Sequence, residues 1–535
     1  MEKHFHLTLL LLLALSLRLY PTISSGLPFS VDAWSPIKNT ELILKYTPIS
    51  LDSGILDEYN RYWPANSFFG AVFSQATGLK PIIAMAIGIP LVGALTISIF
   101  YVLIYRISGS RKLALFSSIL LATAYPYTLF TAGVTKETYA NPLYVLSILI
   151  FLSHIGWRGM ILFVVASLAL IMAHHLTTLV TIATLAAIAL ASSIIRIRRG
   201  ESPDRSGFLP LSILIALTAL YFTLYAHRGL KVTLTASDLF SAASYQILAF
   251  TIALYLTFKP QNPSNWRTLL TCAASAAIVF LIAFLCTRRP LIPDAPTLPS
   301  HYLLYAAPFI LLAPLTVLGL KELRSIEGEN NLVPLFWLST LAGLEAYAVF
   351  GDTPLGLTLA YRALNPLCIP LITLSAYGLH RLYKAYSGLR RQRVAKVIAI
   401  AALIAVAALN SYSVYASVSF QERYLGYFWL YTQPEYYAAA WIKGAASSEI
   451  IACDVKTSYM LKDYFGLNTD TLQGLQYLTG KTGSKPQILF TYQQMSRNGY
   501  VIYGGYSVDL PENWMEKASQ MNLIYSNRVA YIHAK

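Results

Sequence analysis

Charged residues are scarce in this chain, because only 12% of its 535 residues are Asp, Glu, Lys or Arg. Soluble globular domains are about a quarter charged. Hydrophobic residues make up 56% of the sequence, and its mean hydropathy is +0.53. This balance excludes an ordinary soluble protein and indicates a polytopic membrane protein.

Cysteine is also rare. The chain has four cysteines, and no two of them stand in a CxxC spacing. Cys272, Cys286 and Cys368 lie in or beside apolar segments, whereas Cys453 stands alone in the C-terminal region. This pattern argues against a disulfide framework and against a cysteine-based zinc site. Internal repeats and low-complexity tracts are absent as well.

The positive charge of the chain follows its apolar segments. The formal net charge is +15, a value that would also suit a nucleic-acid partner. Lys and Arg occur, however, in short clusters between apolar runs. That distribution is typical of membrane topology rather than of a nucleic-acid-binding groove. We therefore expect membrane lipids as partners, and no nucleic acid.

Apolar segments long enough to cross a bilayer, which takes about 17–25 residues, recur along most of the chain. We expect about 13 transmembrane helices. They lie at 6–23, 81–105, 113–131, 138–155, 159–174, 176–195, 208–226, 242–258, 268–287, 302–320, 333–351, 363–380 and 397–417.

The charges between these segments predict their orientation. If the N-terminus is cytoplasmic, the inner turns carry 19 Lys and Arg residues, and the short outer loops carry six. This asymmetry favours a cytoplasmic N-terminus, and an odd number of spans then places the C-terminus outside. A cleaved signal peptide is an alternative for the first segment, because Lys3 precedes a leucine run that is followed by small residues at 24–26.

The spans divide the chain into a transmembrane domain at 1–418 and an extracytoplasmic domain at 419–535. A first outer loop at 24–80 mixes aromatic and charged residues, which favours helices lying at the membrane interface. For the C-terminal region, the sequence predicts helices at 434–443 and 511–521, strands at 449–455 and 488–492, and a hairpin at 523–532. The expected fold class is mostly α, a helix bundle with a small α/β domain.

Ionisable residues gather on the predicted outer side of the bundle. Asp32 stands about ten residues beyond the first apolar segment, and Glu137 follows Lys136 at a helix start, where anions are favoured. Glu345 lies inside an apolar segment, which makes it a functional candidate or one half of a structural pair. The remaining candidates are His174, His175 and Arg362.

These residue types suit particular chemistry. Acids and imidazoles bind divalent metals or remove protons, and arginines hold phosphates. Each residue also has a plainer interpretation, because outer loops are polar in any membrane protein. The two adjacent histidines, for example, could cap a tight turn.

Short motifs along most of the chain resemble those of the GT-C superfamily of integral membrane glycosyltransferases. They are Leu17-Arg18-Leu19-Tyr20-Pro21, Asp32-Ala33-Trp34, Tyr62-Trp63-Pro64 with Gly70 and Thr77-Gly78, Thr135-Lys136-Glu137-Thr138-Tyr139-Ala140, His174-His175-Leu176-Thr177-Thr178, Tyr361-Arg362-Ala363-Leu364-Asn365-Pro366, and 436–442 leading to Asp454. The last of these resembles the outer domain of archaeal members. Each motif is short, and the pattern as a whole carries the resemblance.

The resemblance implies a donor sugar on a polyprenyl phosphate, such as dolichyl phosphate, and a lipid, glycan or protein acceptor. Asp32 would be the catalytic acid of the first outer loop, acting as a base on the acceptor or helping to hold a divalent cation such as Mg²⁺ or Mn²⁺. Glu137 would stand at the place of the family's second outer acid, as a further catalytic residue and metal ligand. The substrate-binding residues would be Arg362, His174, His175, Lys136 and Glu345, with Arg362 and His175 at the phosphate.

The spans and the outer domain also resemble the catalytic subunit of oligosaccharyltransferases. The chain has, however, no Trp-Trp-Asp-Tyr-Gly motif at 419–535 and no Asp-x-Asp motif in the first outer loop. We therefore expect a monosaccharide transferase rather than transfer of a whole glycan to asparagine. Two alternatives are a transporter or flippase of lipid-linked sugars, which usually shows internal repeats, and a non-catalytic membrane scaffold.

Overall fold

A computed structural model of the chain describes residues 2–51, 54–153, 156–203, 207–229, 235–259, 265–290, 296–324, 329–351, 353–384, 389–446 and 448–535. Its contacts divide the chain into two compact units. The helical unit comprises Met1–Leu17, Val92–Phe130 and Tyr139–Val414. The mixed unit comprises Arg18–Leu91, Thr131–Thr138 and Tyr415–Lys535.

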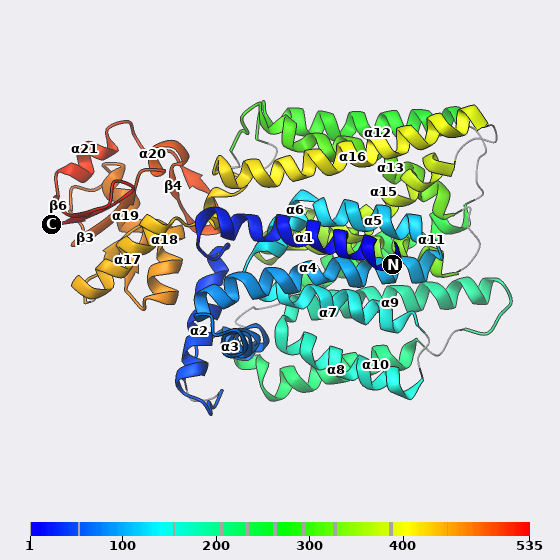
Figure 1. The fold of residues 1–535 in the computed structure, drawn as a ribbon, viewed down its shortest axis with the longest axis horizontal. Helices are drawn as coiled ribbons and strands as arrows, with labels where there is room; N and C mark the ends of the chain where they lie inside the picture. The colour runs from blue at the N-terminus through cyan, green and yellow to red at the C-terminus, as the bar shows by residue number, and fades with distance from the viewer. Residues whose placement is uncertain are drawn as a thin grey trace. The chain divides into compact units, whose positions relative to one another are not determined.

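Long apolar helices build the helical unit (Figure 1). They are α1 (Glu2–Ser25), α4 (Pro81–Ser108), α5 (Arg111–Thr123), α6 (Tyr125–Ala132), α7 (Lys136–Phe151), α8 (Trp157–Ala173), α9 (His175–Arg198), α10 (Phe208–Leu224), α11 (Ala236–Phe258), α12 (Asn265–Cys286), α13 (Tyr302–Leu323), α14 (Val333–Phe350), α15 (Pro354–Lys384) and α16 (Leu389–Ser419), with the short turns η3 (Ala226–Arg228) and η4 (Glu329–Leu332). Helices α1, α4, α6, α7 and α16 continue from one unit into the other.

The multi-pass membrane class is confirmed. In the part of the chain that the structure describes, nine helices are long and apolar enough to cross a membrane. Helices α8 and α10 are apolar but have 17 residues each, and α7 has 16. Every predicted segment coincides with a helix or with the pair α5 and α6, but the number of crossings stays a prediction.

The segment expected at 113–131 is bent rather than straight. Helices α5 and α6 meet at an angle of 63°, and Ala124 between them has a non-helical ψ of 107°. Pro126 explains the break, because a proline ring clashes with the preceding helical turn and offers no N–H group. The amide of Tyr125 instead donates to Oδ1 of Asn410 at 2.9 Å.

Close helix packing forms the core of the helical unit. Helix α13 packs against α12 and α15, and α14 packs against α9, α11 and α15. At the α13–α15 contact, a Cβ atom on Gly319 would lie 1.8 Å from the carbonyl oxygen of Leu374, and one on Gly378 would lie 2.0 Å from that of Leu315. Small residues permit this approach, as is common between membrane helices.

The mixed unit combines short helices with two sheets. Its helices and turns are η1 (Val31–Ala33), α2 (Trp34–Lys45), η2 (Asn60–Tyr62), α3 (Ala65–Thr77), η5 (Tyr427–Trp429), α17 (Gln433–Ala445), α18 (Val455–Tyr459), the π-helical turn η6 (Met460–Tyr464), α19 (Thr471–Leu478), α20 (Met495–Asn498), η7 (Tyr503–Gly505) and α21 (Trp514–Ser519). Its strands are β1 (Ile451–Ala452), β2 (Thr469–Asp470), β3 (Ile488–Tyr492), β4 (Tyr500–Val501), β5 (Ser507–Val508), β6 (Asn522–Ser526) and β7 (Ala530–Ala534).

The larger sheet has the strand order β2-β1-β3-β7-β6, and β4 pairs with β5 in a separate antiparallel hairpin. Strand β1 is parallel to β2 and β3, whereas β7 is antiparallel to β3 and β6. The small α/β sheet domain is therefore confirmed, with α17, β3 and the β6–β7 hairpin at their predicted places.

Two predicted elements of this sheet domain are shorter than expected. The strand predicted at 449–455 ends at Ala452, because the side chain of Asp454 accepts a hydrogen bond from the amide of Thr457 at 2.8 Å and begins α18. Such a cap satisfies an otherwise unpaired helix amide. The helix predicted at 511–521 is limited to α21.

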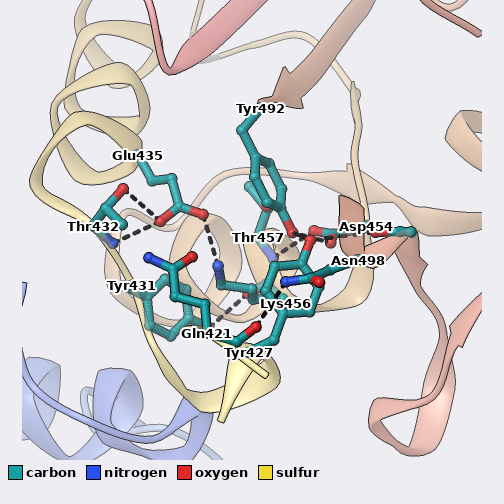
Figure 2. A network of polar contacts seen from close by, with 11 residues as sticks. Gln421, Tyr427, Tyr431, Thr432, Glu435, Asp454, Lys456, Thr457, Tyr492 and Asn498 are labelled. Atoms are coloured by element: carbon teal, nitrogen blue, oxygen red, sulfur yellow. Dashed lines mark hydrogen bonds and ion pairs between the residues drawn. The ribbon is translucent and has the colours of Figure 1, made fainter. Parts of the chain in front are cut away.

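A buried network of polar groups lies within the mixed unit (Figure 2). Nζ of Lys456 lies 2.7 Å from Oε1 of Glu435, and the two side chains are 2% and 3% exposed. The ammonium group also lies 4.8–5.3 Å from the ring centroids of Tyr427, Tyr431 and Tyr492. The pair is thus desolvated but surrounded by favourable partners.

Removing the cation from this pair should destabilise the protein. The Lys456→Met substitution would leave the Glu435 carboxylate buried without its counter-charge, which typically costs about 3–5 kcal/mol. Thermal unfolding of the purified protein in detergent should show the loss. The double variant Lys456→Met/Glu435→Leu should recover much of it, because apolar replacements of a buried pair are often neutral.

Lys481 provides the matched control, because its side chain is exposed. The Lys481→Met substitution should change stability by no more than about 0.5 kcal/mol. Equal unfolding curves for Lys456→Met and Lys481→Met would show that the buried pair does not stabilise the unit.

Candidate functional site

Asp32 lies on a turn whose other residues are buried. The side chain of Asp32 is exposed, whereas Val31 and Ala33 on either side of it are buried. Ser30 precedes the turn η1 with a positive φ of 96°, and its Oγ accepts a hydrogen bond from the amide of Asp32 at 3.2 Å. Positive φ is uncommon outside glycine, so the local backbone conformation is held by its surroundings.

Two distant segments of the mixed unit hold this turn by backbone hydrogen bonds. The amide of Val134 donates to the carbonyl oxygen of Phe29 at 2.9 Å. The amide of Ser30 donates to the carbonyl oxygen of Trp429, also at 2.9 Å. The first outer loop, the segment 131–138 and the C-terminal region therefore meet at Asp32.

Trp34 anchors the other side of the turn. Its side chain is 0% exposed and belongs to one hydrophobic core with Leu27, Val31 and residues of the C-terminal sheet domain. Its ring lies edge-on to Tyr431 with a centroid distance of 5.0 Å and stacks on Tyr436 at 6.1 Å. Asp32 is thus attached to a packed aromatic core two residues away.

The structure places Lys136 and Glu137 in the same unit as Asp32. Both stand in the first turn of α7, after Thr135, whose Oγ1 accepts from the amide of Thr138 at 3.0 Å. Nζ of Lys136 lies 3.7 Å from the ring centroid of Tyr59 and 5.5 Å from that of Trp63. Lys136 therefore joins the segment 131–138 to the first outer loop through cation–π contacts.

A neighbouring acid of the first outer loop has a different environment. The carboxylate of Asp57 accepts hydrogen bonds from Oγ of Ser35 at 2.6 Å, from Nδ2 of Asn39 at 2.6 Å and from the amide of Asn60 at 2.7 Å. Its oxygens are occupied by the loop itself. Asp57 therefore ties the loop to α2 and serves the structure.

A further acid, Asp463, stands in η6 of the C-terminal region and was not among the candidates expected from the sequence. The pKa of the Asp463 carboxyl is raised to about 6, chiefly by burial and to a smaller extent by the negative charges of Asp57 and Asp32, against the opposing effect of Lys462. Turn η6 packs on α2, where the hydroxyl of Tyr464 donates to Oε1 of Glu41 at 2.7 Å. An acid with a near-neutral pKa is therefore electrostatically coupled to Asp32.

The remaining candidates belong to the helical unit. The side chain of His174 caps α9, with its Nδ1 2.8 Å from Oγ1 of Thr177, and the ring centroids of His174 and His175 are 5.0 Å apart. Nε of Arg362 donates to the hydroxyl of Tyr361 at 2.8 Å. Glu345 is half-buried in α14, and no described residue bonds to its buried Oε2.

No cluster of ligand side chains marks the expected metal site in the described part of the chain. Among the residues that the structure describes, no group of three or more His, Cys, Asp or Glu side chains is placed to hold a metal ion. A cation bound by Asp32 and Glu137 would therefore need ligands other than such a cluster.

Comparison with known proteins identifies the fold. No family model and no curated protein sequence matches the chain significantly. The apo crystal structure of the Archaeoglobus fulgidus oligosaccharyltransferase matches with a TM-score of 0.60 and 13% identity over 92% of this chain and 69% of that chain. The chain has the GT-C fold.

Two further structures show the range of this similarity. The complex of the same Archaeoglobus enzyme with Zn and sulfate matches with a TM-score of 0.59 and 13% identity over 92% of this chain and 68% of that chain. ArnT from Cupriavidus metallidurans bound to undecaprenyl phosphate matches with a TM-score of 0.40 and 13% identity over 98% of this chain and 97% of that chain. A TM-score this low supports no argument. The structural match to the Archaeoglobus enzyme shows the fold alone, and the activity is left to be proposed.

Asp463 makes stability depend on pH. Because its pKa in the folded protein, about 6, lies above the ordinary pKa of an aspartate side chain, 3.8, the native state binds a proton more tightly than the unfolded state. Stability should therefore fall as pH rises from about 4 to about 6. Asp463→Asn should remove this loss and raise the stability at neutral pH by on the order of 1–3 kcal/mol, measured by thermal unfolding across that pH range.

A second variant at the adjacent residue provides the comparison. Lys462→Gln removes the charge that opposes the raised pKa, so the loss of stability with pH should become larger. If Asp463→Asn instead follows the wild-type stability at every pH, the half-buried position of the carboxyl group does not raise its pKa.

Proposed function

We propose that the protein transfers a sugar from a polyprenyl phosphate to an acceptor at the outer face of the membrane, with Asp32 as the catalytic carboxylate. The observation that carries the proposal is an exposed acid on a rigid, otherwise buried turn within a GT-C fold. An acid that only stabilised the loop would have its oxygens bound, as Asp57 does. Exposure together with a fixed backbone is what a reacting group requires.

The proposed reaction is a displacement at the anomeric carbon. The acceptor oxygen forms a bond to that carbon while the bond from the carbon to the phosphate oxygen breaks, and the polyprenyl phosphate leaves. Asp32 takes the proton from the acceptor hydroxyl. Positive charge and hydrogen-bond donors near the leaving phosphate stabilise the transition state. We assign the phosphate contacts to Arg362 and His175, and we assign other substrate contacts to His174, Lys136 and Glu345.

Glu137 is proposed as a second acid at the site, because its segment binds the Asp32 turn through Val134. A divalent cation held between Asp32 and Glu137 would contribute positive charge toward the phosphate. The cation requirement is tested directly by assaying with and without Mg²⁺ or Mn²⁺.

The acceptor is the open part of the proposal. One structure of the Archaeoglobus enzyme holds a tethered acceptor peptide that contains the NVT sequon, so peptides belong among the acceptors to be tried. The absence of a Trp-Trp-Asp-Tyr-Gly motif in the C-terminal region favours transfer of a monosaccharide to a lipid or glycan.

The test is sugar transfer by the purified protein from radiolabelled polyprenyl-phosphate sugars. Asp32→Asn should lower the transfer rate by about 10²–10⁴-fold, the usual contribution of a general base. The thermal unfolding midpoint should stay unchanged, because the Asp32 side chain is exposed. Glu512→Gln, which removes another exposed carboxylate of the same unit, should retain full activity.

Two outcomes would count against the proposal. Full activity of Asp32→Asn would remove Asp32 from the mechanism. Absence of transfer by the wild-type protein from every donor, together with movement of lipid-linked sugars across vesicles, would instead establish a transporter or flippase.

The proposed site requires that the C-terminal region lie outside the cell. A reporter enzyme fused after Arg393 should therefore be active in the cytoplasm, and one fused after Lys535 should be active outside. This expectation follows from the excess of Lys and Arg in the inner turns. The reverse pattern would place Asp32 on the cytoplasmic side and overturn the proposed location of transfer.

A further inference from the structure

The hairpin of β4 and β5 exposes two tyrosines on the surface of the protein. Its tip, defined here as residues 503–506, carries Tyr503 and Tyr506 with 83% and 58% of their surfaces exposed. Gly504 and Gly505, which lie between them, have φ values of 83° and 81°, a backbone conformation that residues other than glycine rarely adopt. A Cβ atom on Gly505 would also lie 2.7 Å from the ring of Phe428, so the tip is fitted closely to the segment beneath it.

Short connections attach this hairpin to the end of the last membrane helix. Helix α16 ends at Ser419. Nδ2 of Asn498 donates to the carbonyl oxygen of Gln421 at 2.8 Å, and Nη2 of Arg423 donates to that of Ser507 at 2.7 Å. Arg423 also pairs with Asp509.

The length of this connection restricts where the hairpin lies. Arg423 follows Ser419 by four positions, and an extended chain spans at most about 3.6 Å per residue. The base of the hairpin is therefore within about 14 Å of the end of α16. If α16 ends at the membrane surface, this short tether keeps the hairpin within reach of the headgroup layer, which is roughly 5–8 Å thick on each side of the hydrocarbon core.

The exposed residues there suit a lipid headgroup layer. At the end of α16, Tyr415 and Phe420 are 47% and 41% exposed, and their rings lie 5.9 Å apart. Tyrosine and tryptophan concentrate at this depth, because the ring contacts the acyl boundary while the hydroxyl stays hydrated. Arg497, which is exposed just before β4, adds a positive charge that attracts anionic headgroups.

We propose that the hairpin tip inserts into the headgroup layer and anchors the C-terminal sheet domain to the membrane surface. The partner is the lipid surface itself, contacted by Tyr503 and Tyr506 at the tip. This role is separate from the proposed sugar transfer and would hold whether or not the protein is a transferase.

Photo-crosslinking from within the hairpin tests the proposal. The full-length protein carrying p-benzoylphenylalanine in place of Tyr503 is placed in phosphatidylcholine–phosphatidylglycerol nanodiscs and irradiated, and mass spectrometry of the hairpin peptide identifies the adduct. We expect phospholipid adducts at position 503. The substitution should not disturb folding, because it replaces one exposed aromatic side chain with another.

Leu523 on β6 is the control, because it is also a large exposed side chain of the same unit, with 55% of its surface exposed, but belongs to the other sheet. The yield of phospholipid adduct should be several-fold higher at 503 than at 523. Equal yields at the two positions would overturn the membrane anchor. It would also be overturned if position 503 crosslinked to an added saccharide or peptide acceptor and not to phospholipid.

Discussion

The burial of Trp34 is the contact on which the rest of the mixed unit depends. This side chain is fully enclosed among Tyr431, Tyr436 and Tyr464. Removing a tryptophan from such a core typically costs about 3–5 kcal/mol. Because Asp32 is only two residues away, the packing energy of the aromatic core restricts the backbone that carries an exposed carboxylate.

This arrangement reconciles two demands on a reacting acid. The group must be open to its substrate, yet it must not move when the substrate arrives. Exposed loops alone seldom satisfy the second demand. Here the chain before Asp32 is bound by Val134 and Trp429, and the chain after it is packed in the core, so the side chain alone keeps its freedom.

The acids near Asp32 show how burial and bonding divide their roles. Asp57 has its oxygens bound within the loop, and Glu41 accepts a hydrogen bond from Tyr464 across to the C-terminal region. Asp463 is placed where desolvation favours its neutral form. These acids all stand in polar stretches of the sequence. Only their tertiary contacts distinguish Asp32, the exposed candidate, from the acids that serve the structure.

That contrast explains what could be predicted from the sequence. The apolar segments of α1, α4 and α9 to α16 were predictable, because the length and hydropathy of a span are local properties. Strand β3 was predictable from a short apolar run, and the β6–β7 hairpin from the turn residues at 526–528. Asp463 was not, because its proximity to Asp32 arises from η6 packing on α2, more than 400 residues apart in the chain.

The buried pair of Glu435 and Lys456 is the remaining constraint on the site. A buried ion pair contributes little net stability compared with apolar packing, but its geometry is demanding. Glu435 binds the start of α17 through Thr432, and Lys456 binds Tyr431 through its carbonyl oxygen. The ring of Tyr431 also meets Trp34 edge-on. We therefore infer that the Glu435–Lys456 pair fixes the position of Tyr431, and that Tyr431 in turn fixes Trp34 and the turn that carries Asp32. Its demanding geometry is then an advantage, since it specifies one position for the aromatic ring next to the candidate catalytic acid.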